Sequence, residues 1–68
     1  MLTSFKLMRR PEVEAMTGLR RSSLYSMMER GIFPKPVKIS ERSVAWIQED
    51  VMTWVNNRIA ATKERHTS

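Results

Sequence analysis

The chain has 68 residues, enough for one small domain with a modest hydrophobic core. It contains no cysteine and a single histidine, His66, so disulfides, thiolate metal sites and histidine-based catalysis are not expected. Twelve Lys and Arg residues against seven Asp and Glu give a formal net charge of +5, which favours a polyanionic partner such as nucleic acid.

Two short helices are predicted in the first half of the chain. Pro11 suits the first turn of a helix over residues 11–17, and Gly18 suits the left-handed position that ends it. A second helical pattern covers residues 22–30 and stops at Gly31. Two such helices joined by a tight turn with a glycine form a helix-turn-helix unit.

A small β-hairpin is predicted next. Pro34 and Pro36 exclude helix from residues 32–36 and favour an extended backbone. Residues 37–39 and 43–47 are rich in β-branched side chains, and the polar residues 40–42 between them form the predicted tip. No residue pair typical of tight hairpin turns is present, so the type of turn stays open.

A third helix is predicted over residues 48–61, where Val51, Trp54, Val55 and Ile59 recur at helical spacing. We expect one domain over residues 1–68, with flexible tails at residues 1–6 and 62–68. Its core is expected to contain both tryptophans and the facing apolar side chains of the first two helices, which are Val13, Met16, Leu19, Leu24 and Met28.

The second helix carries the predicted DNA contacts. If Leu24 and Met28 face the first helix, the opposite side is left in solvent, and its N-terminal end is the part of a recognition helix that enters the major groove. The residues predicted to contact DNA are Arg20, Arg21, Ser22, Tyr25 and Ser26 from this region, and Lys35, Lys38 and Arg42 from the hairpin region. The alternatives are a solvated charged turn at the two arginines, a packing role for Tyr25 at the helix junction, and an ordinary charged hairpin.

Other classes of function are disfavoured by the same sequence. Both glycines lie at helix ends, so no phosphate-binding loop is expected, and Glu49 and Asp50 suit a helix start better than an acid–base pair. We expect no enzyme activity, no cofactor and no metal. No apolar run is long enough to span a membrane and no secretory signal is present, which predicts a cytoplasmic protein with access to the nucleoid.

Several segments together resemble the AlpA family of prophage regulators. They are residues 13–19 (VEAMTGL), 21–25 (RSSLY), 33–38 (FPKPVK) and 42–46 (RSVAW), and the resemblance extends from about Leu7 to Ile59. It implies a MerR-like winged helix-turn-helix, with a recognition helix near Arg21 and a wing around residues 38–42. In such proteins the output is activation of a prophage integrase gene, whereas in the similar excisionases it is DNA bending.

The chain departs from this family pattern at two places. Arg20 stands where the family commonly has a serine that caps the recognition helix, so the helix start is expected to shift to Ser22. Ser40 and Glu41 stand at the wing tip where glycine and proline are common, and Glu41 would face DNA phosphates unfavourably. The wing is therefore expected to reach less far into the minor groove.

The sequence thus predicts a mainly helical winged helix-turn-helix domain that binds double-stranded DNA as a transcriptional regulator. One alternative is an excisionase-like architectural factor. Another is a small adaptor that binds a protein, such as an integrase or a response regulator, through Trp54 or the last helix. Because no segment resembles a dedicated dimerisation element, we expect a monomer whose copies bind adjacent DNA sites, and no membrane partner.

Overall fold

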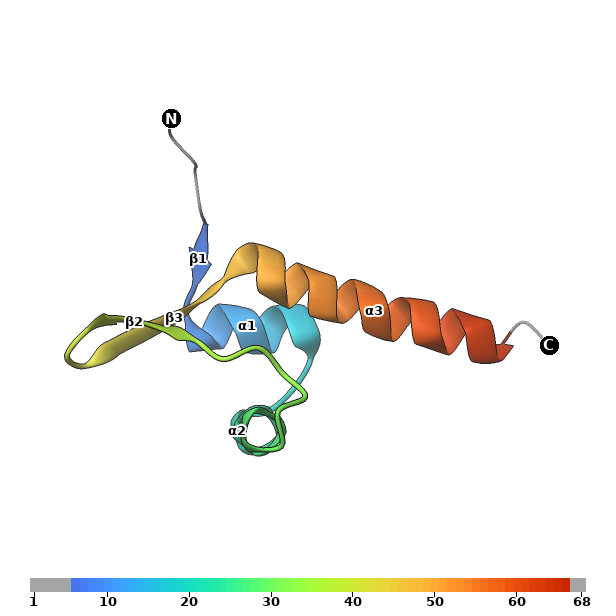
Figure 1. Ribbon diagram of the computed structural model, residues 1–68, viewed down its shortest axis with the longest axis horizontal. Helices are drawn as coiled ribbons and strands as arrows, with labels where there is room; N and C mark the ends of the chain where they lie inside the picture. Colours follow the sequence, from blue (N-terminus) through green and yellow to red (C-terminus); the bar gives the residue numbers. More distant parts are fainter. Residues whose placement is uncertain (1–5, 67–68) are drawn as a thin grey trace.

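Three helices and a small antiparallel sheet make up the chain, as the computed structural model shows for residues 6–66, with side chains described to residue 63 (Figure 1). Along the chain the elements are β1 (Leu7–Met8), α1 (Arg10–Thr17), α2 (Arg21–Glu29), β2 (Val37–Ser40), β3 (Ser43–Ile47) and α3 (Gln48–His66). The helix-turn-helix of α1 and α2, followed by the β2–β3 wing, is the mainly helical winged architecture predicted from the sequence.

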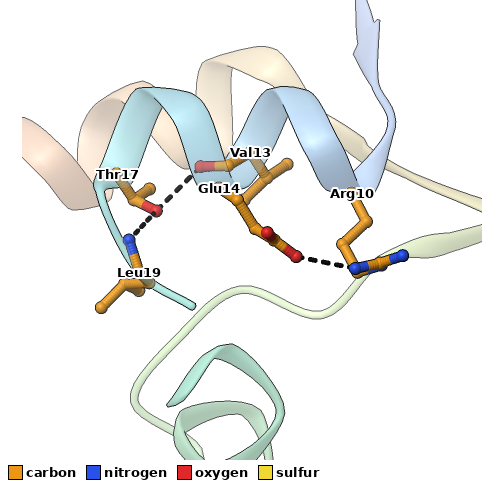
Figure 2. Close-up of polar contacts among 5 residues, drawn as sticks. All are labelled: Arg10, Val13, Glu14, Thr17 and Leu19. Atoms are coloured by element: carbon orange, nitrogen blue, oxygen red, sulfur yellow. Dashed lines mark hydrogen bonds and ion pairs between the residues drawn. The ribbon is translucent and has the colours of Figure 1, made fainter. Parts of the chain in front are cut away.

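The start of α1 is built from local backbone and side-chain signals. The N–H of Arg9 donates to Glu12 Oε1 at 2.9 Å, so a side chain of the first turn satisfies a backbone donor that precedes the helix. Pro11 lies in the first turn, as its missing N–H allows. One turn further on, Arg10 Nη1 and Glu14 Oε2 form an ion pair at 2.8 Å (Figure 2).

The tight turn between α1 and α2 is held by Thr17 and Gly18. The Thr17 hydroxyl donates to Val13 O at 2.8 Å and accepts from the N–H of Leu19 at 3.2 Å, which links the last helical turn to the residue beyond it (Figure 2). Gly18 has φ = 77°, and its N–H donates to Glu14 O at 2.8 Å. The predicted left-handed helix end at Gly18 is confirmed.

Substitution of Gly18 by alanine is expected to lower the free energy of unfolding by about 1 kcal/mol, because an L-residue with a side chain is strained at this φ. An added Cβ would meet nothing within 4 Å, so the cost comes from the backbone alone. Urea titration followed by circular dichroism measures the change. Ser23→Ala, at an exposed position inside α2, is the control and should be neutral or slightly stabilising. Equal stabilities for the two variants would contradict the explanation.

The second helix begins at Arg21, one residue before the Ser22 start expected from the missing cap. Arg20 is the N-cap and makes no side-chain capping hydrogen bond, but its extended backbone places its carbonyl to accept from the N–H of Leu24 at 2.9 Å. The backbone alone therefore starts this helix. At its other end α2 stops at Glu29, one residue earlier than predicted.

The wing belongs to a three-stranded antiparallel sheet in the order β1-β3-β2. In β3, Trp46 pairs with Met8 of β1, and Ala45 pairs with Val37 of β2. Strand β1 was not predicted from the sequence, since a two-residue strand gives no readable alternation. The tip has two residues, and its register is irregular between Lys38 and Ser40. None of the described residues other than glycine has a positive φ, which excludes the type I′ turn.

The core lies where the two helices, the sheet and the start of α3 meet. Its buried members are Met8, Val13, Leu24, Phe33, Trp46 and Val51, with Leu19, Met27, Met28 and Trp54 packed against them and partly buried. Met16, which was predicted to lie in the core, is instead 40% exposed, and Ile59 of the apolar stripe predicted for the last helix is 48% exposed. Only one of the two tryptophans, Trp46 at 1% exposure, is fully buried.

The last helix is longer than predicted and extends well past the rest of the molecule (Figure 1). It has 19 residues, or about 28 Å, and continues to His66 rather than stopping at residue 61. The tails predicted at residues 1–6 and 62–68 therefore include helical residues up to 66, and the carbonyl of Lys6 accepts from the N–H of Gln48 at 2.8 Å. Residues 1–5 and 67–68 lie outside the described part. No helix in residues 6–66 could cross a membrane.

Candidate nucleic-acid interface

Burial of Leu24 fixes which side of α2 faces outward. Leu24 is completely buried among the core residues, with Met27 and Met28 packed against them, so helical geometry turns the opposite side of the helix to solvent. The exposed positions include all five predicted contacts of this region, which are Arg20, Arg21, Ser22, Tyr25 and Ser26. The structure thus brings these five side chains together on one accessible helix and its N-terminal end.

Arg21 and Tyr25 are in contact on this outer face. The guanidinium carbon of Arg21 lies 5.8 Å from the centre of the Tyr25 ring, at the spacing of one helical turn. Both side chains stay exposed, Tyr25 by 39%. An arginine held in this way keeps its hydrogen-bond donors available while losing part of its conformational freedom before it meets a ligand.

The N-terminal end of α2 is electrostatically positive. The first turn contains no acidic residue, and the helix macrodipole adds to the charges of Arg20 and Arg21. Because the N-cap side chain accepts no hydrogen bond, it does not occupy the free N–H groups of the first turn. This arrangement suits an anion such as a phosphate, since both the backbone donors and the charges favour it.

Lys35 borders a hollow beside α2. Together with Tyr25, Met28, Glu29 and Pro36, it lines a shallow hollow of about 350 Å³ between α2 and the segment that follows it. Tyr25 therefore borders this hollow as well as contacting Arg21. The structure places Lys35 with the α2 residues, although the sequence analysis grouped it with the hairpin.

Lys38 and Arg42 are the cationic side chains of the wing itself. Lys38 is exposed on β2 opposite Val44, and Arg42 is exposed in the two-residue tip beside Glu41. The hairpin extends from the body on the side opposite to the free end of α3 (Figure 1). The candidate surface therefore has two separate parts, one on α2 and one on the wing.

Two tryptophans have a role that the sequence analysis did not find. The indole N–H of Trp46 donates to Pro34 O at 2.9 Å, and that of Trp54 donates to Ile32 O at 2.6 Å. Both acceptors lie in the segment that joins α2 to the wing. Sequence spacing cannot reveal such partners, and the only available signal was that the chain has two tryptophans and two closely spaced prolines between the predicted second helix and the hairpin.

The described side chains offer no arrangement typical of a metal site. Among residues 6–63 no group of three His, Asp or Glu side chains lies close enough to hold an ion. The side chain of His66, the sole histidine, falls outside this range. The chemistry that the surface offers is therefore that of arginine, lysine, hydroxyl and backbone N–H donors.

Comparison with known proteins gives a family match over most of the chain. Residues 6–59 match a family model described as "Prophage CP4-57 regulatory protein (AlpA)". Over 62 residues the chain is 37% identical to an uncharacterized protein, ORF88, of Enterobacteria phage P4, and the aligned region covers 91% of this chain and 70% of that protein. The family match includes α1, α2, the wing and the first part of α3.

Proposed function

Because the chain belongs to the AlpA family of prophage regulatory proteins, we propose that it regulates transcription by binding double-stranded DNA. The observation that carries this proposal is the position of Arg20, Arg21 and their polar neighbours on the one exposed face of the second helix of a helix-turn-helix. A helix presented in this way fits the major groove of B-DNA.

In the proposed complex, α2 lies in the major groove with its N-terminal end deepest. Arg21 offers a bidentate pair of donors to a guanine edge, with Tyr25 supporting its guanidinium. Ser22 and Ser26, one turn apart, offer hydroxyl groups to bases or phosphates. The first-turn N–H groups and Arg20 bind the phosphate backbone.

The wing contributes contacts to the sugar–phosphate backbone or the minor groove. Lys38 supplies the main charge, since Arg42 shares the tip with Glu41, which repels phosphate. Lys35 binds a phosphate beside the recognition helix. Such a small module covers little DNA, so we propose that further copies bind adjacent sites and together supply the specificity of regulation.

A protein adaptor is the second candidate function. The observation that favours it is exposed apolar surface on α3, where Met52 is 42% exposed and Ile59 is 48% exposed. A phage integrase or a response regulator are partners of this kind. The two candidates differ in how binding depends on salt.

Affinity for a nonspecific duplex is expected to fall steeply with salt concentration. If the surface neutralises about three to six phosphates, a plot of log affinity against log salt concentration has a slope of about −0.9 per phosphate. Fluorescence anisotropy with a labelled duplex at several salt concentrations measures it, and an uncharged peptide nucleic acid duplex is the control. A protein that does not bind DNA, or whose affinity for DNA does not change with salt concentration, would contradict the proposal and favour the adaptor.

A further inference from the structure

The inference concerns the connector, defined as residues 32–36 between α2 and β2. Its first residue is tied to the end of the recognition helix, where Gly31 adopts φ = 74°. The N–H of Gly31 donates to Met28 O at 3.1 Å, and the N–H of Ile32 donates to Met27 O at 2.9 Å. This pair of bonds is the Schellman motif, which fixes the direction in which the chain leaves the helix.

The first three residues of the connector, Ile32, Phe33 and Pro34, each contact β3 or α3. The carbonyls of Ile32 and Pro34 accept the indole N–H groups of Trp54 and Trp46. Between them, the Phe33 side chain is 4% exposed and meets the Trp54 ring edge-on at 4.9 Å between centroids. Trp46 and Trp54, which we call the indole clamp, thus connect β3 and α3 to one short segment.

Two further features stiffen this arrangement. Pro34 and Pro36 have fixed φ angles, so the connector has few conformations to explore. The Arg58 guanidinium lies over the Trp54 ring at 4.7 Å from its centre, on a tryptophan that is only partly buried. Arg58 therefore holds the indole in place from α3 itself.

We propose that the indole clamp positions the wing relative to the recognition helix, so that both contact one duplex at the same time. The connector is the covalent link between these two parts, and the clamp fixes it at both sides of Phe33. When one part is bound, a rigid link keeps the other at a high effective concentration over the DNA, whereas a loose link adds an entropic cost. This inference rests on the proposed DNA-binding function.

The rigidity of the link can be measured without DNA. Because the chain contains no cysteine, Ser23→Cys on α2 and Glu41→Cys at the wing tip accept two spin labels at chosen positions. Double electron–electron resonance should give one narrow distance distribution in this labelled parent. Trp54→Phe keeps a ring against Phe33 but removes the donor to Ile32 O, and should broaden the distribution.

Two further variants test the origin of this effect. Arg58→Ala leaves every buried side chain in place. It should also broaden the distance distribution, but by less than Trp54→Phe does. Val55→Ala is the matched control, because Val55 is partly buried on the same helix but makes no hydrogen bond to the connector. Circular dichroism verifies that each variant is folded. A distribution that stays narrow in both Trp54→Phe and Arg58→Ala overturns the clamp.

DNA affinity then tests the consequence for binding. On an unlabelled chain, Trp54→Phe should weaken binding about tenfold when Lys38 is present, and less than twofold in a Lys38→Ala background, where the wing contributes little. An equal loss in both backgrounds would show that Trp54 supports α2 or the whole fold instead, and would overturn the inference. Absence of DNA binding by the unchanged protein would instead overturn the proposed function, while the distance measurement still decides whether the clamp exists.

Discussion

Replacing Trp46 with alanine is expected to leave the chain largely unfolded. Trp46 is the largest of the fully buried side chains, and removing such a ring costs about 3–5 kcal/mol. The substitution also removes the indole N–H that donates a hydrogen bond to Pro34 O. A small domain has a total stability of only about 5 kcal/mol, so this loss consumes most of it.

Far-UV circular dichroism and a thermal melt measure the outcome for Trp46→Ala. Val44→Ala is a suitable control, since Val44 lies in the same strand but is 40% exposed, and that variant should melt cooperatively close to the unchanged protein. The loss of stability in Trp54→Ala should lie between those of Trp46→Ala and Val44→Ala, because Trp54 is only partly buried. A Trp46→Ala chain that melts cooperatively with a small loss of stability would show that the core is held by other contacts.

Arg21→Ala is expected to weaken binding to the natural DNA site by about 1–3 kcal/mol and to relax the preference at one or two base pairs. The reason is that a bidentate arginine contact distinguishes guanine from other bases, and nothing else in the first turn of α2 replaces it. Arg21→Lys separates charge from geometry, since it keeps the charge but lacks the planar pair of donors. It should retain nonspecific affinity and lose the base preference.

Lys38→Ala provides the comparison from the wing. It should weaken binding to all DNA sequences alike and reduce the magnitude of the salt slope by about one unit, as expected for a phosphate contact. Selection from a randomised duplex library, followed by binding measurements on the selected and random sequences, determines both effects. If Arg21→Ala and Lys38→Ala behave identically on the two kinds of DNA, then α2 is not the base-reading helix.

The parts of the fold that could be predicted from the sequence are those with local causes. Gly18 and Gly31 both adopt positive φ at helix ends, as their positions after apolar periodic runs indicated. Pro34 and Pro36 excluded helix from the connector, and β-branched residues on each side of a polar tip predicted the wing strands. In each case the determining atoms lie within a few residues along the chain.

The parts that could not be predicted depend on contacts between distant residues. Strand β1 exists because Met8 pairs with Trp46, and two residues alone give no β pattern. The core includes Val51 of α3, with Trp54 packed against it, but not Ile59, which is 48% exposed, whereas periodicity alone defines only the face of a helix. Residues 62–66 have no apolar pattern, but they also contain no helix-breaking residue, so the helix continues to His66.

The candidate site was predictable at the level of which residues face outward. Burial of Leu24 determines that Arg21, Tyr25 and their neighbours are exposed, and apolar periodicity was enough to indicate it. The contact between Arg21 and Tyr25, the position of Lys35 beside α2 and the indole clamp all depend on side-chain conformation or tertiary packing. Contact of these residues with DNA bases stays a prediction.

The pairing of β1 with β3 determines the order in which a newly synthesised chain can complete its fold. Leu7 pairs with Ile47, so one of the first described residues needs a partner that the ribosome adds much later. Helices α1 and α2 emerge earlier, but Val13 and Leu24 are covered only when Trp46 and the start of α3 are available. Non-local pairing of this kind is slow compared with helix formation. We therefore expect the nascent α2 to remain without a stable core until translation has passed the wing.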